Sequence, residues 1–105
     1  MYIVIFVTAS DKDEAEKISN QLVEDKLVAC VNIVDGVASI FRWKEKVDKA
    51  GEALLIMKTK QVLFSQIAET IKSLHSYTVP EIIAFPIVEG SEDYLKWVDG
   101  ELKEN

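Results

Sequence analysis

The side chains best suited to bind a metal ion are thinly spread along this sequence. It contains one cysteine, Cys30, and one histidine, His75, and the carboxylate of Glu81 follows shortly after the histidine. Copper favours imidazole and thiolate ligands, and divalent ions in proteins generally take about three or four ligands. A tight metal site within one subunit is therefore not expected. The predicted place for such a site is a cleft between subunits, where His75 and Glu81 of one copy meet groups such as Cys30 of a neighbour.

Each of these residues also has a purely structural interpretation. Cys30, within a strand, would pack as a small hydrophobic residue. His75 ends an apolar helical stripe and is suited to closing a helix C-terminus, while Glu81, at the start of a strand, is suited to accept a bond from a backbone N–H. The aromatic residues predicted to pack or to form an interface are Phe41, Trp43, Tyr77 and Trp97.

Four apolar runs are predicted to form strands. Residues 2–7 are β-branched and aromatic, which is typical of a strand. Residues 27–43 predict one long strand with a bulge or bend at Asp35-Gly36. A charged, turn-prone segment at 45–51 then leads into residues 53–57, which return as the second strand of a hairpin. Residues 82–88 predict a fourth strand, and Pro86 in it indicates an edge position or a bulge.

Three runs with helical periodicity separate or follow these strands. Asp11 is predicted to cap the first helix, with the Glu14 side chain returning a bond to the Asp11 N–H. Thr59 is predicted to cap the second helix, and Ser91 begins a short third helix that runs to Leu102. The apolar residues at helical spacing are Ala15, Ile18, Leu22 and Val23 in the first helix and Phe64, Ile67, Ala68, Ile71, Leu74 and His75 in the second.

The resulting order, βαββαβ with an extra C-terminal helix, predicts a single α+β domain over residues 1–105 with the ferredoxin-like sandwich fold and an antiparallel sheet. In that fold both crossover helices cover one face of the sheet. The other face should then alternate with polar residues, yet the strands are apolar on both faces, apart from a break at Asn32. Monomers rarely expose such a surface. The sequence therefore favours burial against other copies, and the long hairpin at 37–50 adds unpaired edges suited to the same purpose.

Composition excludes several classes of partner. The net charge of −6 disfavours nucleic acid and anionic membrane surfaces, which require clustered Lys and Arg. A single cysteine permits no intrachain disulfide, which fits the reducing cytosol, so a cytoplasmic location is expected. The apolar run at 2–7 lacks a basic leader and is too short for a membrane anchor. No set of acid, base and nucleophile stands out, so an enzyme is not expected.

Several short motifs occur in an order and spacing that resemble the CutA family of divalent-ion tolerance proteins. They are Ala29-Cys30-Val31-Asn32, Phe41-Arg42-Trp43, Glu52, Lys58-Thr59 and His75-x-Tyr77-x-Val79-Pro80-Glu81-Ile82. The likeness runs from the first strand to residues 93–97, nearly the whole chain. It implies homotrimers of ferredoxin-like subunits, similar in architecture to the trimeric PII signalling proteins. It also implies tolerance and binding of divalent metal ions, copper above all.

The chain departs from the family pattern at two places. The family usually has His-Pro-Tyr-Glu where this chain has His75-Ser76-Tyr77-Thr78, which removes a rigid proline and a carboxylate beside the histidine. The family also usually has a glycine where this chain has Glu45, so a different conformation is expected at the hairpin tip.

Two functions are consistent with these observations. The first is a trimeric protein of divalent-metal tolerance that binds copper(II) or another divalent cation, with no obligatory cofactor. The second is a trimeric scaffold or small-ligand sensor of the PII type, which uses the clefts between subunits without physiological metal binding. The motifs favour the first function, and the sparse set of metal ligands favours the second.

Overall fold

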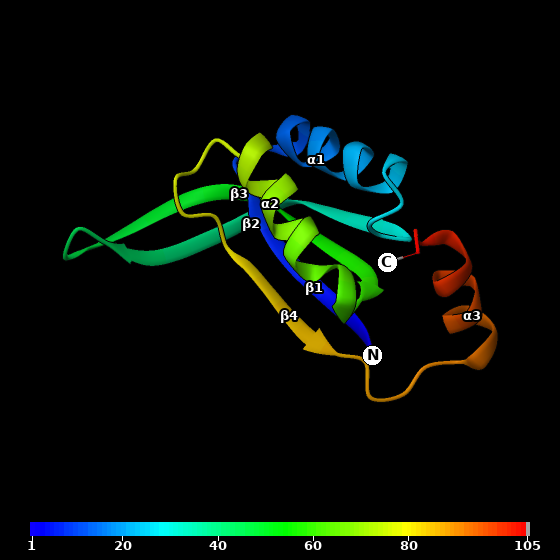
Figure 1. Ribbon diagram of the computed structural model, residues 1–105. Coiled ribbons are helices and arrows are strands. Elements are labelled where there is room, and N and C mark those ends of the chain that lie inside the picture. Colours follow the sequence, from blue (N-terminus) through cyan, green and yellow to red (C-terminus); the bar gives the residue numbers. More distant parts are fainter. Residues whose placement is uncertain (105) are drawn as a thin grey trace.

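The computed structural model describes residues 1–104, which form an antiparallel sheet with two helices on one face and a third beside its end (Figure 1). The elements are β1 (Tyr2–Ala9), α1 (Lys12–Glu24), β2 (Cys30–Trp43), β3 (Lys46–Lys60), the 3₁₀ turn η1 (Gln61–Leu63), α2 (Phe64–Leu74), β4 (Ile82–Pro86) and α3 (Glu92–Glu101). The strand order is β2-β3-β1-β4, and each neighbouring pair is antiparallel. This is the ferredoxin-like α+β fold that the sequence predicts. Pro86 ends β4, which is an edge strand, as expected.

The core lies between the sheet and the helices, because β1 and β3 place every second side chain on that side. The buried residues of the strands are Ile3, Ile5, Val7 and Ala9 of β1 and Ala53, Leu55 and Met57 of β3. The helices contribute the buried residues Ala15, Ile18, Leu22, Ile67, Ile71 and Val98. Each fully buried aliphatic side chain of the size of Leu or Ile stabilises the fold by about 1.5–3 kcal/mol. Among the first helix's predicted apolar residues, only Val23 stays largely exposed.

Two predicted helix caps have different outcomes. The Asp11 side chain accepts a 2.8 Å hydrogen bond from the Glu14 N–H, which confirms it as the cap of α1. The Glu14 side chain, however, bonds the N–H of Ser10 and not that of Asp11, so half of the predicted reciprocal arrangement is wrong. Thr59 caps nothing, because β3 continues to Lys60. Its buried hydroxyl donates a 2.6 Å bond to the Leu27 carbonyl oxygen.

The hairpin of β2 and β3 extends beyond the rest of the sheet (Figure 1). We call its projecting part, residues 37–52, the arm. The arm residues of β3 pair with β2 alone, since β1 pairs with β3 only at residues 53–60. The predicted bulge at Asp35-Gly36 is confirmed by a register shift between Val34 and Val37, and Gly36 has a φ of 69°.

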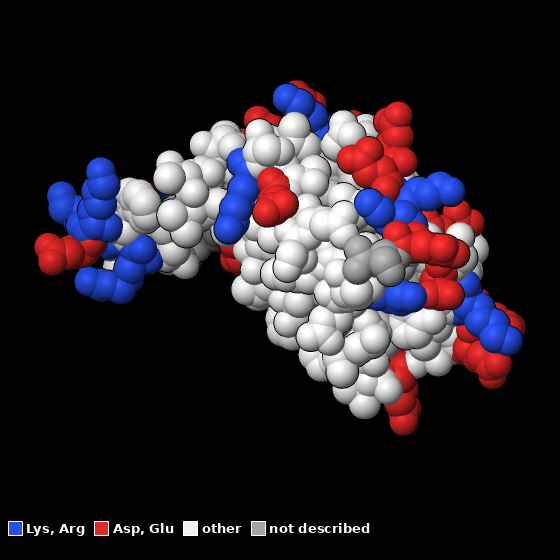
Figure 2. All heavy atoms as spheres, in the orientation of Figure 1, with Lys and Arg blue, Asp and Glu red and all other residues white. Residues whose placement is uncertain are grey.

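The turn of the arm is shorter than the charged segment 45–51 suggested. It consists of Lys44 and Glu45, whose φ angles of 50° and 66° are both positive, and β3 begins directly afterwards at Lys46. Residues 46–51 pair in register with 38–43, because charged side chains on a strand can point into water while the backbone stays bonded. Figure 2 shows the charged side chains at the outer end of the arm, where Lys and Arg outnumber Asp and Glu.

The sheet face away from α1 and α2 is apolar, as the sequence predicts. We call it the open face. Its aliphatic and aromatic residues, placed by strand register, are Val4, Phe6, Val34, Leu54, Ile56, Ile83 and Phe85. Val34, Ile83 and Phe85 are 44–46% exposed, and the rings of Phe6 and Phe85 lie 5.0 Å apart. The polar break at Asn32 is compensated by a hydrogen bond from Lys58.

Candidate functional site

The structure places the three predicted metal ligands at two ends of the sheet. Cys30 pairs with Lys58, which in turn pairs with Val4 near the start of β1. His75 bonds the Thr8 carbonyl oxygen near the end of β1. Four residues of a strand span about 13 Å. Within residues 1–104 no group of three or more His, Cys, Asp or Glu side chains is arranged to hold a metal, so the site between subunits stays a prediction.

The ring of His75 is buried and bonded at both nitrogens. Its Nε2–H donates a 2.7 Å bond to the Thr8 carbonyl oxygen. Its Nδ1 accepts a 3.0 Å bond from the Tyr77 N–H and therefore carries no proton in this arrangement. The 3.7 Å approach of Glu14 Oε1 to Nδ1 is thus not an ion pair while the ring is neutral. A metal ion can bind His75 only after the ring leaves one of these bonds.

Glu14 fastens the loop after α2 to the start of α1. Its Oε1 accepts bonds from the Ser10 N–H and hydroxyl, and its Oε2 accepts a 2.8 Å bond from the Ser76 N–H. Burial opposes ionisation of this carboxyl, but the bonds from Ser10 and Ser76 outweigh it and lower the pKa of Glu14. Proline has no N–H. The bond at position 76 therefore depends on a residue that has a backbone N–H, such as the serine of this chain, and a proline there would remove it.

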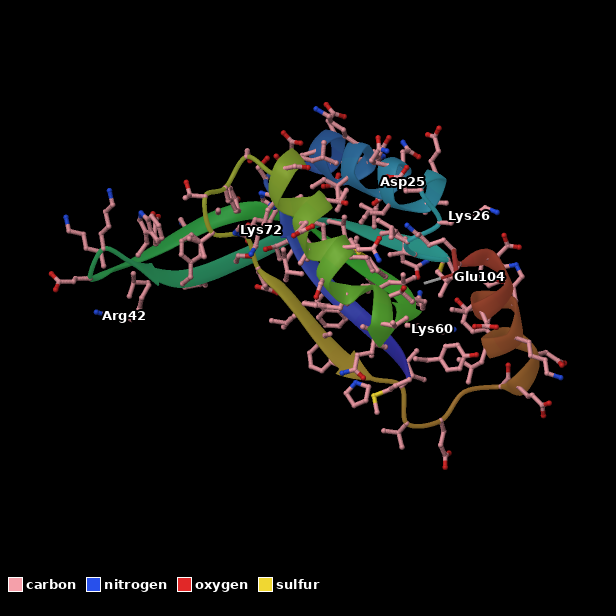
Figure 3. The ribbon with its side chains drawn as sticks, in the orientation of Figure 1. Asp25, Lys26, Arg42, Lys60, Lys72 and Glu104 are labelled. Atoms are coloured by element: carbon pink, nitrogen blue, oxygen red, sulfur yellow. The ribbon has the colours of Figure 1, made fainter. Side chains whose placement is uncertain are left out.

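Between the arm and the loop 75–81 lies a concave site, which we call the arm groove. Its volume is about 640 Å³, and its lining residues are Thr8, Ser39, Ile40, Phe41, Trp43, Asp48, Glu52, Tyr77, Thr78, Val79 and Glu81. The Tyr77 hydroxyl donates a 2.9 Å bond to Glu52 Oε2, which ties the loop to the base of the arm. Figure 3 shows the side chains along the arm, with Arg42 labelled near its outer end.

The groove has a carboxylate at its base and aromatic walls. Glu52 is only 9% exposed, and the Tyr77 hydroxyl is the one hydrogen-bond partner of its side chain within residues 1–104. Burial raises the pKa of Tyr77 to about 12, and the bond to Glu52 acts in the same direction. Phe41 and Trp43 are 39% and 57% exposed, so much of their ring surface is available to a ligand.

The structure brings together three of the four predicted interface residues. Phe41, Trp43 and Tyr77 all line the groove, together with the predicted metal ligand Glu81. Trp97 lies on α3, where its ring is 5.7 Å from that of Tyr94. Sequence reasoning did not select Glu52 or Asp48 as site residues. The available signals for Glu52 were its place among the motifs that resemble the family and its position directly before the apolar run 53–57.

Cys30 has a neighbour that the sequence did not suggest. Its Sγ lies 3.5 Å from the Tyr94 hydroxyl, so the start of β2 contacts α3. This contact and partial burial raise the pKa of Tyr94 to about 12. The thiol is only partly buried.

In residues 1–104 no helix combines the length and the apolar character needed to span a membrane.

Comparison with known proteins identifies the family. The family described as CutA1 divalent ion tolerance protein matches residues 3–101. The divalent-cation tolerance protein CutA of Thermus thermophilus is 46% identical over 95 residues, which cover 90% of this chain and 92% of that protein. The chloroplastic protein CutA of Arabidopsis thaliana is 45% identical over 96 residues, covering 91% of this chain and 53% of that protein. This chain therefore spans about half the length of the Arabidopsis relative.

Solved structures agree with these matches. A divalent cation tolerance protein from Thermus thermophilus superposes with a TM-score of 0.96 at 44% identity, over 98% of this chain and all (100%) of that chain. A protein from Archaeoglobus fulgidus, named a periplasmic divalent cation tolerance protein, superposes with a TM-score of 0.95 at 40% identity, again over 98% of this chain and 100% of that one. The fold, the sequence motifs and the near-complete coverage lead to one conclusion. The chain belongs to the CutA1 family of divalent ion tolerance proteins.

Proposed function

We propose that this chain acts in divalent-metal tolerance as a homotrimer that binds copper(II) between its subunits. Family membership supports the tolerance role. The observation that carries the assembly is the open face, where Val34, Ile83 and Phe85 remain nearly half exposed on a sheet whose other face is packed. A monomer of this size rarely leaves such a surface in water. Closed rotational symmetry is the usual way for identical copies to cover it.

The position of the ligands also supports a site between subunits. Cys30 and His75 lie toward opposite ends of the sheet within one chain, so they can share a metal only if a second copy supplies one of them. Glu81 is exposed just before β4, an edge strand that a neighbour can approach. Copper binding at His75 then requires the ring to exchange its bond with Thr8 or Tyr77 for the metal.

Sedimentation equilibrium and calorimetry with copper(II) chloride test this proposal. At micromolar concentration, the expected mass of the particle is three times the chain mass of 11.8 kDa. Copper affinity should fall in Cys30→Ser, Glu81→Gln and His75→Ala and stay unchanged in Glu89→Gln, an exposed carboxylate outside the site. A well-folded 11.8 kDa particle would refute the trimer. Equal copper affinity in the parent and the three site variants would refute the ligand set.

A second candidate is a trimeric scaffold or small-ligand sensor of the PII type, without physiological metal binding. The arm groove favours it, since a concave site of about 640 Å³ with aromatic walls suits a small molecule better than a bare ion. A screen of metabolites by melting temperature distinguishes the candidates. A metabolite that raises the melting temperature, with copper inert, supports the sensor. The reverse result supports the metal protein.

We further propose that the protein is not an enzyme and that it works in the cytoplasm. The first statement rests on the residues described, in which no Ser or Thr hydroxyl of the groove is hydrogen-bonded to a base. The second rests on the single cysteine, which suits a reducing compartment. Since relatives include proteins named chloroplastic and periplasmic, fractionation of the source cells is the appropriate test of location.

A further inference from the structure

The arm groove contains a buried carboxylate without a charged partner. Glu52 is 9% exposed, its Oε2 accepts one bond from Tyr77, and no cationic side chain lies within ion-pair distance of it in the described part of the chain. Buried charges in proteins are normally paired or neutralised, because removing them from water is costly. A phenol stabilises a carboxylate but does not balance its charge. The groove is therefore suited to receive a cation from outside the chain.

The walls of the groove indicate what kind of cation it is. Phe41 and Trp43 present aromatic surface on the arm side, and Tyr77 contributes a third ring from the loop. The faces of such rings attract cations that are weakly hydrated. A bare divalent ion needs several ligands close together, and no such group occurs in residues 1–104. The volume of about 640 Å³ lies within the range of small-molecule sites. These features favour an organic cation over a metal ion.

The spacing of the carboxylates indicates that the cation carries more than one charge. Asp48 and Glu52 both line the groove from β3 and are separated by about 13 Å along the strand. Glu81 adds a third carboxylate from the loop. A single ammonium group cannot contact both Asp48 and Glu52 at that separation. Two ammonium groups joined by a short methylene chain can contact both, and the chain between them would pack against the aromatic rings.

We infer that the arm groove binds a short linear diammonium ion, with one nitrogen at Glu52 and the other toward Asp48 and Glu81. The inference rests on the second candidate function, the small-ligand sensor, and names the class of its ligand. It involves neither Cys30 nor His75. It shares Glu81 with the proposed copper site, so Cys30→Ser, which should weaken copper binding and leave diamine binding unchanged, separates the two by experiment.

Calorimetry of the full chain with 1,5-diaminopentane tests the inference. Pentylamine and 1,5-pentanediol serve as the singly charged and uncharged controls. We expect the diamine to bind, the monoamine to bind at least about 10-fold more weakly and the diol to give no heat. Glu52→Gln keeps an oxygen acceptor for Tyr77 and should weaken diamine binding by at least about 30-fold. Glu101→Gln, at the end of α3 remote from the arm (Figure 1), should not change it.

A second variant guards against a folding defect. Tyr77→Phe removes the hydrogen bond between Tyr77 and Glu52 but keeps the carboxylate, so it should retain most of the diamine affinity if charge is what matters. If the parent protein gives no heat with the diamine, the inference is overturned. That result is expected if a lysine of a neighbouring copy already fills the groove. Equal affinity in Glu52→Gln also overturns it. If another class of metabolite raises the melting temperature while the diamine is inert, the sensor function stands and the inference fails.

Discussion

The Nε2–H of His75 donates a 2.7 Å hydrogen bond to the carbonyl oxygen of Thr8, and so joins the end of α2 to the end of β1. The Nδ1 of the same ring accepts from the Tyr77 N–H. The imidazole therefore holds the loop that carries Tyr77 into the arm groove. This structural role exists in the single chain, before any metal ion or second copy is considered.

Replacing His75 should destabilise the fold. His75→Ala removes two hydrogen bonds of a buried ring and leaves a cavity, so we expect the free energy of unfolding to fall by about 2–4 kcal/mol. Urea denaturation followed by circular dichroism measures this change. Lys72→Ala, at an exposed position in the last turn of α2, is the control and should change stability by less than about 0.5 kcal/mol. An equally small effect of His75→Ala would contradict the structural role.

The serine at position 76 should control the ionisation of Glu14. Ser76→Pro removes the N–H that donates to Glu14 Oε2, so the pKa of Glu14 should rise toward its ordinary value, whereas Ser76→Ala keeps the donor and should change it less. Carbon-detected NMR of the Glu14 carboxyl group measures both.

The pH dependence of stability follows from the same pKa. Because the folded-state pKa of Glu14 is lowered, this carboxylate stabilises the protein above its unfolded-state pKa, and the stabilisation is lost as the pH falls through the folded-state pKa. Ser76→Pro should reduce that acid sensitivity. Identical acid unfolding curves for the proline and alanine variants would contradict the assignment.

Two tyrosines should make the fold sensitive to alkali. The pKa values of Tyr77 and Tyr94 are both raised to about 12, and an unfolded tyrosine ionises near pH 10. The folded state thus retains these protons after the unfolded state has lost them. Their contribution to stability is complete below about pH 10 and is lost as the pH rises toward 12. Denaturation at pH 9 and about pH 11 should show a smaller loss in Tyr94→Phe than in the parent.

Glu45 should be a site where glycine stabilises the protein. Its φ of 66° lies in the left-handed region, which costs a residue with a Cβ atom about 1 kcal/mol relative to glycine. Glu45→Gly should therefore raise the free energy of unfolding by up to about 1 kcal/mol. The control Lys46→Gly places glycine at the first paired residue of β3 and should destabilise the arm. If both variants have the same sign, the turn conformation is not the cause.

A charge on the open face should disrupt the proposed trimer. Ile83 is 46% exposed on β4 and faces Phe6 across the strand pair. Ile83→Lys keeps a strand-compatible length but places an ammonium group on a surface proposed to be buried between copies. Sedimentation should then show an 11.8 kDa species. Val62→Lys, at an exposed position in η1, should leave the assembly intact. An unchanged mass for Ile83→Lys would place the interface elsewhere.

The sequence predicted the features that depend on local pattern. The helical spacing of apolar residues and the glycine at position 36 located the buried helix faces and the bulge, because each depends on residues close together in the chain. Long-range contacts were less accessible. The pattern around Thr59 resembles a helix cap, but pairing of Lys60 with Tyr2 continues the strand, and the hydroxyl instead finds the Leu27 carbonyl oxygen.

The arm groove illustrates the same limit for function. Phe41, Trp43 and Tyr77 were predicted from their type alone to pack or to form an interface. Their convergence around Glu52 depends on the path of the loop 75–81, which Glu14 and His75 determine through bonds to residues far away in sequence. Because those bonds join residues far apart in the chain, no periodic pattern of the sequence predicts them. The role of Glu52 could therefore be inferred only once its burial and its single partner were known.

The register shift at Asp35-Gly36 also makes the hairpin modular. Beyond it, residues 37–43 pair only with 46–52, and neither β1 nor β4 pairs with these residues. Inserting two residues into each strand near the turn would preserve the alternation of side chains between the two faces and every strand pairing outside the arm. The length of the arm and the stability of the rest of the domain can thus be changed separately, and the arm can be lengthened without redesigning the core.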